Sequence, residues 1–90
     1  MERITIKMLE RKIEYLNRIT DSPADPYGKD DEGNFKANPG NYHLSGAYGG
    51  WCLEQMHNEG GGVRSIIPGY RPKRELFELI CAYINGMEAA

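Results

Sequence analysis

The chain has 90 residues, of which 40% are hydrophobic and 27% charged, and its formal net charge is -2. A chain of this length buries about 60 to 65% of its unfolded surface, so we expect one domain over residues 1–90. The composition lies outside the range of disordered chains. The net charge argues against direct binding to DNA or RNA, which usually requires a basic surface.

Two further features favour a cytoplasmic protein without membrane contact. No apolar run approaches the roughly 18 residues that span a bilayer, and Met1–Thr5 leads into charged helical sequence without a signal-peptide core. Cys52 and Cys81 are too few for a secreted disulfide scaffold. We expect both to be free thiols.

The first predicted element is a helix over residues 6–20. Its apolar residues recur at intervals of three and four at Ile6, Leu9, Ile13 and Leu16, and Met8, Tyr15 and Ile19 lie beside them. The regular interval places the first set on one helical face, and the second set widens that face. The wide face indicates either a groove between other elements or the seam of a homodimer.

Residues 21–40 predict an extended loop. Prolines and glycines are dense in this range, at Pro23, Pro26, Gly28, Gly33, Pro39 and Gly40. A loop of about 20 residues is expected to be functional or to be packed by its own aromatics, here Tyr27 and Phe35. The acids at 30–32 are consecutive and lack the alternate spacing of a calcium loop.

A β-hairpin is predicted over residues 41–57. The strands are 42–47 and 51–56, and Tyr48-Gly49-Gly50 joins them, although the second segment is also compatible with a helical turn. Three glycines at 60–62 then break the chain before a possible short strand at 63–67, which ends at Pro68-Gly69.

The last predicted element is a helix over residues 72–86. Pro72 suits the first turn, Asn85-Gly86 suits the end, and Leu76, Ile80, Tyr83 and Met87 share one face. The element order predicts an α+β fold in which two helices pack on one face of a small antiparallel hairpin or three-stranded sheet.

Glycines, aromatics and cations in the second half of the chain form the candidate ligand-binding site. Rings can stack on a planar ligand, glycines admit it closely, and cations at a helix start favour an anion. The candidate residues are Tyr42, Tyr48, Trp51 and Tyr70 for stacking, Gly49, Gly50, Gly61 and Gly62 for access, and Arg64, Arg71, Lys73 and Arg74 for the anion. The alternative is that the glycines only shape turns and that Glu75 and Glu78 compensate the cations.

Metal and catalytic constellations are weak in this sequence. His43, Cys52, His57 and Cys81 lack the close paired spacing of zinc ligands. Nothing in the sequence brings Cys52 together with either histidine as a nucleophile and its base. We therefore expect a non-enzymatic protein without metal or cofactor.

Three segments carry a resemblance to a known group. The segments are 40–51 (GNYHLSGAYGGW), 58–63 (NEGGGV) and 72–76 (PKREL), and the chain resembles small accessory proteins encoded by tailed phages and prophages. The resemblance implies a protein made in an infected bacterium that counteracts host defence. Its partner would be an anionic, nucleotide-like small molecule or, alternatively, a host protein that it occludes; nucleic acid is a third and less favoured partner.

Overall fold

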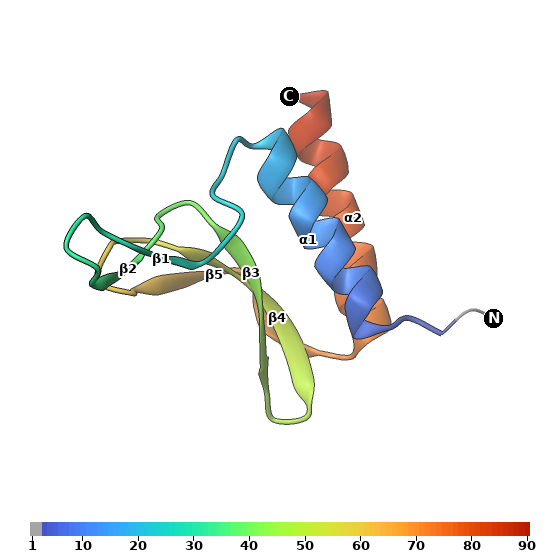
Figure 1. The fold of residues 1–90 in the computed structure, drawn as a ribbon. Helices are drawn as coiled ribbons and strands as arrows, with labels where there is room; N and C mark the ends of the chain where they lie inside the picture. The colour runs from blue at the N-terminus through green and yellow to red at the C-terminus, as the bar shows by residue number, and fades with distance from the viewer. Residues whose placement is uncertain (1–2) are drawn as a thin grey trace.

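A computed structural model describes residues 3–90 and confirms the predicted α+β class (Figure 1). The elements in chain order are α1 (Ile6–Ile19), β1 (Tyr27–Lys29), β2 (Phe35–Ala37), β3 (Tyr42–Ala47), β4 (Gly50–Met56), β5 (Val63–Arg71) and α2 (Lys73–Ala89). Neither helix of residues 3–90 combines the length and the apolar character needed to cross a bilayer.

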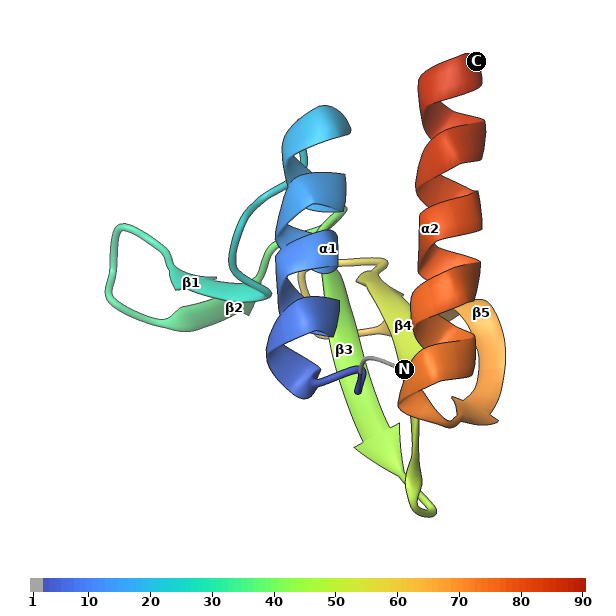
Figure 2. The same ribbon diagram turned by 90° about the vertical axis from the view of Figure 1, so that its right-hand side faces the viewer.

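The main sheet is an antiparallel meander in the order β3-β4-β5, and both helices cover the same face of it. α1 contacts β3, whereas α2 contacts β4 and β5, and the helices also touch each other. Figure 2 shows them side by side and running in the same direction. This is the predicted layer of two helices on a three-stranded sheet.

The core lies between the helices and the sheet. Its fully or nearly fully buried members are Leu9, Ile13 and Leu16 of α1, Leu76, Ile80 and Ile84 of α2, and Tyr42 and Leu53 of the sheet. The stripe predicted on α1 is therefore largely the buried one. On α2, the buried residues are Leu76, Ile80 and Ile84, whereas Met87, near the end of the predicted stripe, is exposed.

A buried side chain locks α1 to β3. The Asn17 amide nitrogen donates to the Tyr42 carbonyl oxygen at 3.0 Å, and the Tyr42 backbone N–H donates to the Asn17 amide oxygen at 2.8 Å. Asn17 thus satisfies both backbone groups of one strand residue away from water, which is how a polar side chain is accommodated in a core.

The predicted loop over residues 21–40 is wrong in part, because it contains the two-stranded sheet β1-β2. The pair closes through an Asp30 carboxylate oxygen, which accepts from the backbone N–H groups of Glu32 and Asn34, both at 2.9 Å. Gly33 supplies a backbone φ of +84° in this turn. Local turn bonds and not apolar alternation therefore build this hairpin, and Figure 1 shows it projecting on the side away from the helices.

Two element ends also differ from prediction. β5 continues past residue 67 to Arg71, because Pro68 lies on the edge strand of the sheet, where a missing N–H need not break a ladder. α2 runs through Asn85-Gly86 to Ala89. The segment at 51–56 is a strand and not a helical turn.

Candidate functional site

The candidate site is a depression where the β3-β4 turn approaches the start of α2. Its volume is 520 Å³, and it is lined by Gly46, Ala47, Gly49, Gly50, Trp51 and Lys73. Four of the predicted site residues are therefore brought together: Gly49, Gly50, Trp51 and Lys73. The depression supplies an aromatic wall, a floor with little side-chain bulk and one cation.

Glycine is required at two positions around this depression by close approach. A side-chain carbon on Gly46 would lie 2.7 Å from the Trp51 indole, and one on Gly50 would lie 2.8 Å from the Tyr70 backbone carbonyl carbon. Gly46 faces Trp51 across the β3-β4 pair. These glycines therefore position the indole and the turn. This agrees with the alternative interpretation, in which the glycines shape turns.

Tyr48 and Tyr70 form an aromatic pair at the same end of the sheet. Their ring centroids are 5.6 Å apart in an edge-to-face arrangement, and Tyr48 is 95% exposed. Tyr48 holds a positive φ of 52°, which is uncommon for a residue with a side chain and keeps it at the tip of the turn. Both rings remain accessible to a partner.

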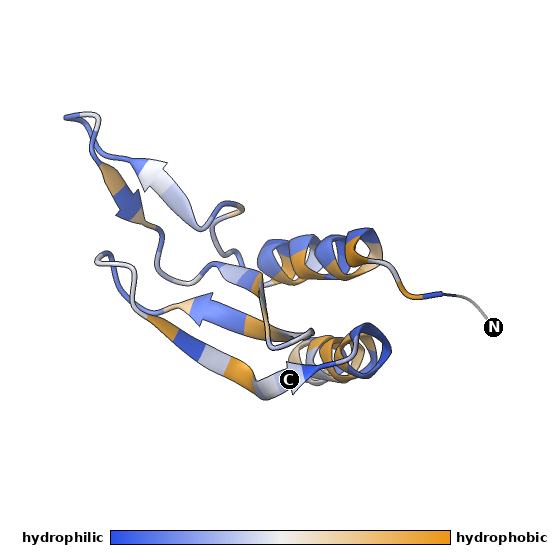
Figure 3. Ribbon diagram, turned by 90° about the horizontal axis from the view of Figure 1, so that it is seen from below, coloured by the Kyte–Doolittle hydropathy of each residue, from blue (hydrophilic) through white to orange (hydrophobic). Residues whose placement is uncertain are grey.

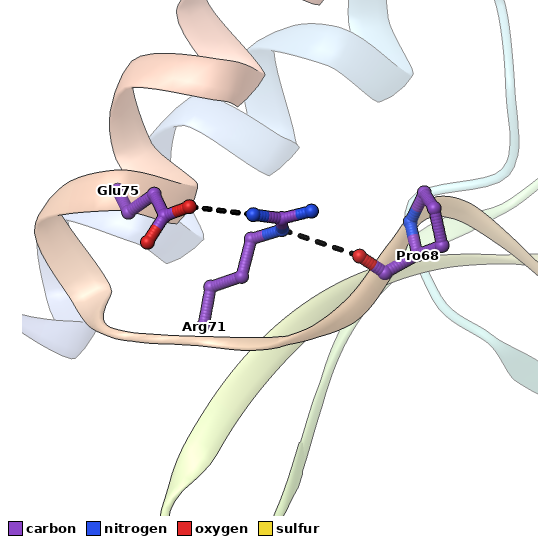
Figure 4. A network of polar contacts seen from close by, with 3 residues as sticks. All are labelled: Pro68, Arg71 and Glu75. Atoms are coloured by element: carbon purple, nitrogen blue, oxygen red, sulfur yellow. Dashed lines mark hydrogen bonds and ion pairs between the residues drawn. The ribbon is translucent and has the colours of Figure 1, made fainter.

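The cations at the start of α2 are only partly as predicted. The Arg71 guanidinium lies 2.5 Å from a Glu75 carboxylate oxygen and donates to the Pro68 carbonyl oxygen at 3.2 Å, as Figure 4 shows. Glu75 therefore compensates Arg71 locally. No side chain caps α2, since Pro72 precedes it, so the positive end of the helix dipole acts beside Lys73 and Arg74.

Four predicted site residues lie away from this depression, namely Tyr42 and, as described below, Gly61, Gly62 and Arg64. Tyr42 is only 4% exposed, its hydroxyl is 3.0 Å from that of Tyr83, and the rings meet edge to face. Burial, together with the Tyr83 hydroxyl, raises the pKa of Tyr42 to about 12. Tyr42 is therefore a core residue and cannot stack on a ligand.

Gly61, Gly62 and Arg64 lie at the opposite end of β4. Gly61 and Gly62 belong to the turn between β4 and β5, whereas Gly49 lies in the turn that precedes β4 and Gly50 is the first residue of β4. The Arg64 guanidinium donates two bonds to the Gln55 side-chain oxygen, at 3.0 and 2.8 Å. Because successive turns of a meander alternate between its two ends, glycines that are close in sequence are separated by the full length of a strand.

Cys52 and His43, a candidate nucleophile and base, lie on the adjacent strands β4 and β3. His43 pairs with Glu54 at 3.4 Å, and Cys52 is buried. Burial, with a contribution from Glu54, raises the pKa of the Cys52 thiol, which opposes the thiolate form that a nucleophile needs. In residues 3–90, no three His, Cys, Asp or Glu side chains are grouped closely enough to hold a metal ion.

A second depression, which local sequence patterns do not indicate, lies between the helices. Its volume is 360 Å³, and its lining residues are Met8, Arg11, Lys12, Tyr15, Arg18 and Phe77. The only signal in the sequence was the position of Met8 and Tyr15 beside the main apolar stripe of α1.

Comparison with known proteins leaves the assignment to the structure itself. No protein-family model matches the chain, and no curated protein or solved structure is significantly similar to it.

Proposed function

We propose that the protein is a non-enzymatic phage or prophage accessory protein that binds an anionic, nucleotide-like small molecule in the depression beside the β3-β4 turn. One observation carries the proposal: Trp51, Lys73 and the uncapped start of α2 meet around a hollow with a glycine floor. Its 520 Å³ volume falls within the roughly 300 to 1,000 Å³ of small-molecule sites.

Each part of the depression suits one part of such a ligand. The indole of Trp51 offers an apolar surface to a base, and Tyr48 and Tyr70 form an exposed ring pair at the same end of the sheet. Lys73, Arg74 and the helix dipole favour a phosphate group. In the host cytoplasm such a protein would lower the free concentration of a defence signal.

The test uses Trp51, the single tryptophan of the chain, as an intrinsic fluorescence probe. We expect a saturable change on titration with at least one of a panel of linear and cyclic nucleotides. Lys73→Glu should weaken that binding at least tenfold, because it reverses the charge beside the ligand. Lys36→Glu, the same change on exposed β2, is the matched control and should leave it unchanged.

Native mass spectrometry of the protein purified gently from its host gives an independent readout. A mass of a few hundred daltons released on denaturation supports the proposal. A bare chain, together with flat nucleotide titrations up to several millimolar, would contradict it.

A second candidate function is occlusion of a host protein, and the β1-β2 hairpin favours it. The hairpin projects from the sheet and carries Phe35, which is 77% exposed, next to the acidic turn at 30–32. Exposed aromatic residues on a projecting element are typical of protein contacts. A polypeptide that co-purifies with the wild-type protein and not with Phe35→Ala would favour this candidate over nucleotide binding.

A further inference from the structure

The depression between α1 and α2 combines an apolar floor with a cationic rim. Met8, Tyr15 and Phe77 supply the apolar part, and Arg11, Lys12 and Arg18 supply three cations in a chain whose formal net charge is -2. The Lys12 ammonium lies 5.9 Å from the centroid of Phe77, and the Arg18 guanidinium lies 5.7 Å from that of Tyr15. The cations thus lie over the rings that they border.

The two acids of α1 do not line this groove, although Glu14 shares a neighbouring depression with Arg18. Glu10 and Glu14 line a separate depression that faces β3, together with Asn17 and Tyr42. One acid reaches the cationic groove, since Glu88 accepts a hydrogen bond from the Tyr15 hydroxyl at 2.8 Å. The remaining rim is positive, so the groove suits an apolar group that carries negative charge beside it.

The tip of the β1-β2 hairpin has that chemistry. Phe35 is a strongly exposed apolar side chain, and Asp31 and Glu32 are exposed acids in the adjoining turn. Figure 3 shows this turn in the blue of hydrophilic residues. Lys36 lies one step further back along β2, and Lys29 pairs directly with Phe35 across the hairpin, with its ammonium 5.4 Å from the Phe35 centroid. The foremost charges are therefore negative.

The tip cannot reach the groove of its own chain. The hairpin projects on the side of the sheet away from the helices, in a molecule that extends over 49 Å along its longest axis (Figure 1). An exposed knob and a complementary groove at opposite ends of one molecule produce a head-to-tail contact between copies.

We infer that the groove formed by Met8, Arg11, Lys12, Tyr15, Arg18 and Phe77 receives Phe35 and the acidic turn of a second copy of this chain. The contact is heterologous, so it adds copies in an open chain and does not close as a two-fold dimer. It is also small, because one hairpin tip enters one groove, and we expect dissociation constants of about 100 µM or weaker.

Sedimentation of the purified chain tests this inference. The average mass should rise with concentration up to about 1 mM at low salt and fall when sodium chloride is raised to 0.5 M, because the charged rim is screened. Phe35→Ala should reduce association at least tenfold. Tyr48→Ala, which removes the exposed aromatic of the other hairpin, should not.

A mixing experiment separates a knob in a groove from other assembly modes. Phe35→Ala lacks the knob and keeps the groove, whereas Arg11→Glu/Lys12→Glu keeps the knob and loses the groove charge. Each variant alone should be monomeric, and their mixture should form a one-to-one complex that grows no further. Lys7→Glu, on α1 but outside the groove, should behave as the wild type.

Each of three results overturns the inference. The first is a chain that stays monomeric at 1 mM and low salt, and the second is a closed dimer unaffected by either variant. The third is a mixture that fails to associate although both variants remain folded by circular dichroism. Loss of nucleotide binding by Lys73→Glu would leave all of these outcomes unchanged, so this inference and the proposed function fail separately.

Discussion

The two hairpins of this protein are held by different forces. β3-β4 lies beneath the helices and places Leu53 and Tyr42 in the core, whereas β1-β2 projects from the sheet with Phe35 exposed at its end. Core packing holds the first, through Tyr42 and Leu53, and the second depends on turn bonds around Asp30. Burial therefore makes β3-β4 essential to the fold, whereas β1-β2 buries Ala37 at its base and leaves its tip free to carry a contact surface.

Truncating a core residue of β3-β4 tests this contrast with the largest expected effect. Leu53→Ala removes a side chain that is 0% exposed and should lower the free energy of unfolding by about 2 to 5 kcal/mol. The measurement is urea unfolding followed by circular dichroism. Phe35→Ala is the matched change at the tip of β1-β2 and should cost less than about 0.5 kcal/mol. Equal losses in the free energy of unfolding for Leu53→Ala and Phe35→Ala would contradict the proposed difference between the two hairpins.

The buried Asn17 clamp should be the next most sensitive point. Asn17→Ala leaves the N–H and C=O of Tyr42 without their side-chain partner, at an expected cost of about 2 to 4 kcal/mol. Asn38→Ala provides the comparison near β1-β2, because its amide donates to the Asp25 carbonyl oxygen at an exposed site. That variant should lose about 1 kcal/mol or less in the same assay. If Asn17→Ala lowered the free energy of unfolding only slightly, water would be able to replace the two hydrogen bonds of Asn17.

Tyr42 should also make stability depend on pH in the alkaline range. Its pKa rises from an unfolded value of 10.0 to about 12 in the folded chain, so the folded state keeps a proton that the unfolded chain releases. The stabilisation is complete below pH 10 and is lost as the pH rises toward 12, and it amounts to about 3 kcal/mol in total. Urea unfolding at pH 9 to 12 should show this decline in the free energy of unfolding. The Tyr42→Phe variant should lack the part of the decline that comes from ionisation of Tyr42. If the free energies of unfolding of the wild type and of Tyr42→Phe changed in parallel with pH, the buried Tyr42–Tyr83 contact would be contradicted.

The smallest expected effect is that of the ion pair that links β2 to the β4-β5 turn. The Lys36 ammonium lies 3.8 Å from a Glu59 carboxylate oxygen, and both side chains are exposed. A double-mutant cycle with Lys36→Met and Glu59→Gln should give a coupling below about 0.5 kcal/mol that disappears in 1 M sodium chloride. A coupling above 1 kcal/mol would indicate that β1-β2 is fixed electrostatically.

The candidate site was only partly predictable from the sequence. Gly49, Gly50 and Trp51 are neighbours in the chain, and Lys73 follows the strand that pairs with Trp51, so their meeting is largely local. Sequence proximity alone predicts that Gly61, Gly62 and Arg64 join them, but proximity does not indicate the end of a sheet at which a turn lies. Tyr42 was predicted to stack on a ligand, but strand alternation turns it toward the helices.

By itself, the sequence determined the helical stripes of α1 and α2, the β3-β4 hairpin and the α+β class, because periodicity and turn glycines act over a few residues. Only the tertiary structure decided that Asn17 clamps Tyr42, that β1 and β2 pair within the expected loop, and that α2 continues through Gly86. The same holds for the cationic groove, which requires Phe77 of α2 beside Tyr15 of α1. Such contacts depend on the packing of distant segments, which local patterns do not specify.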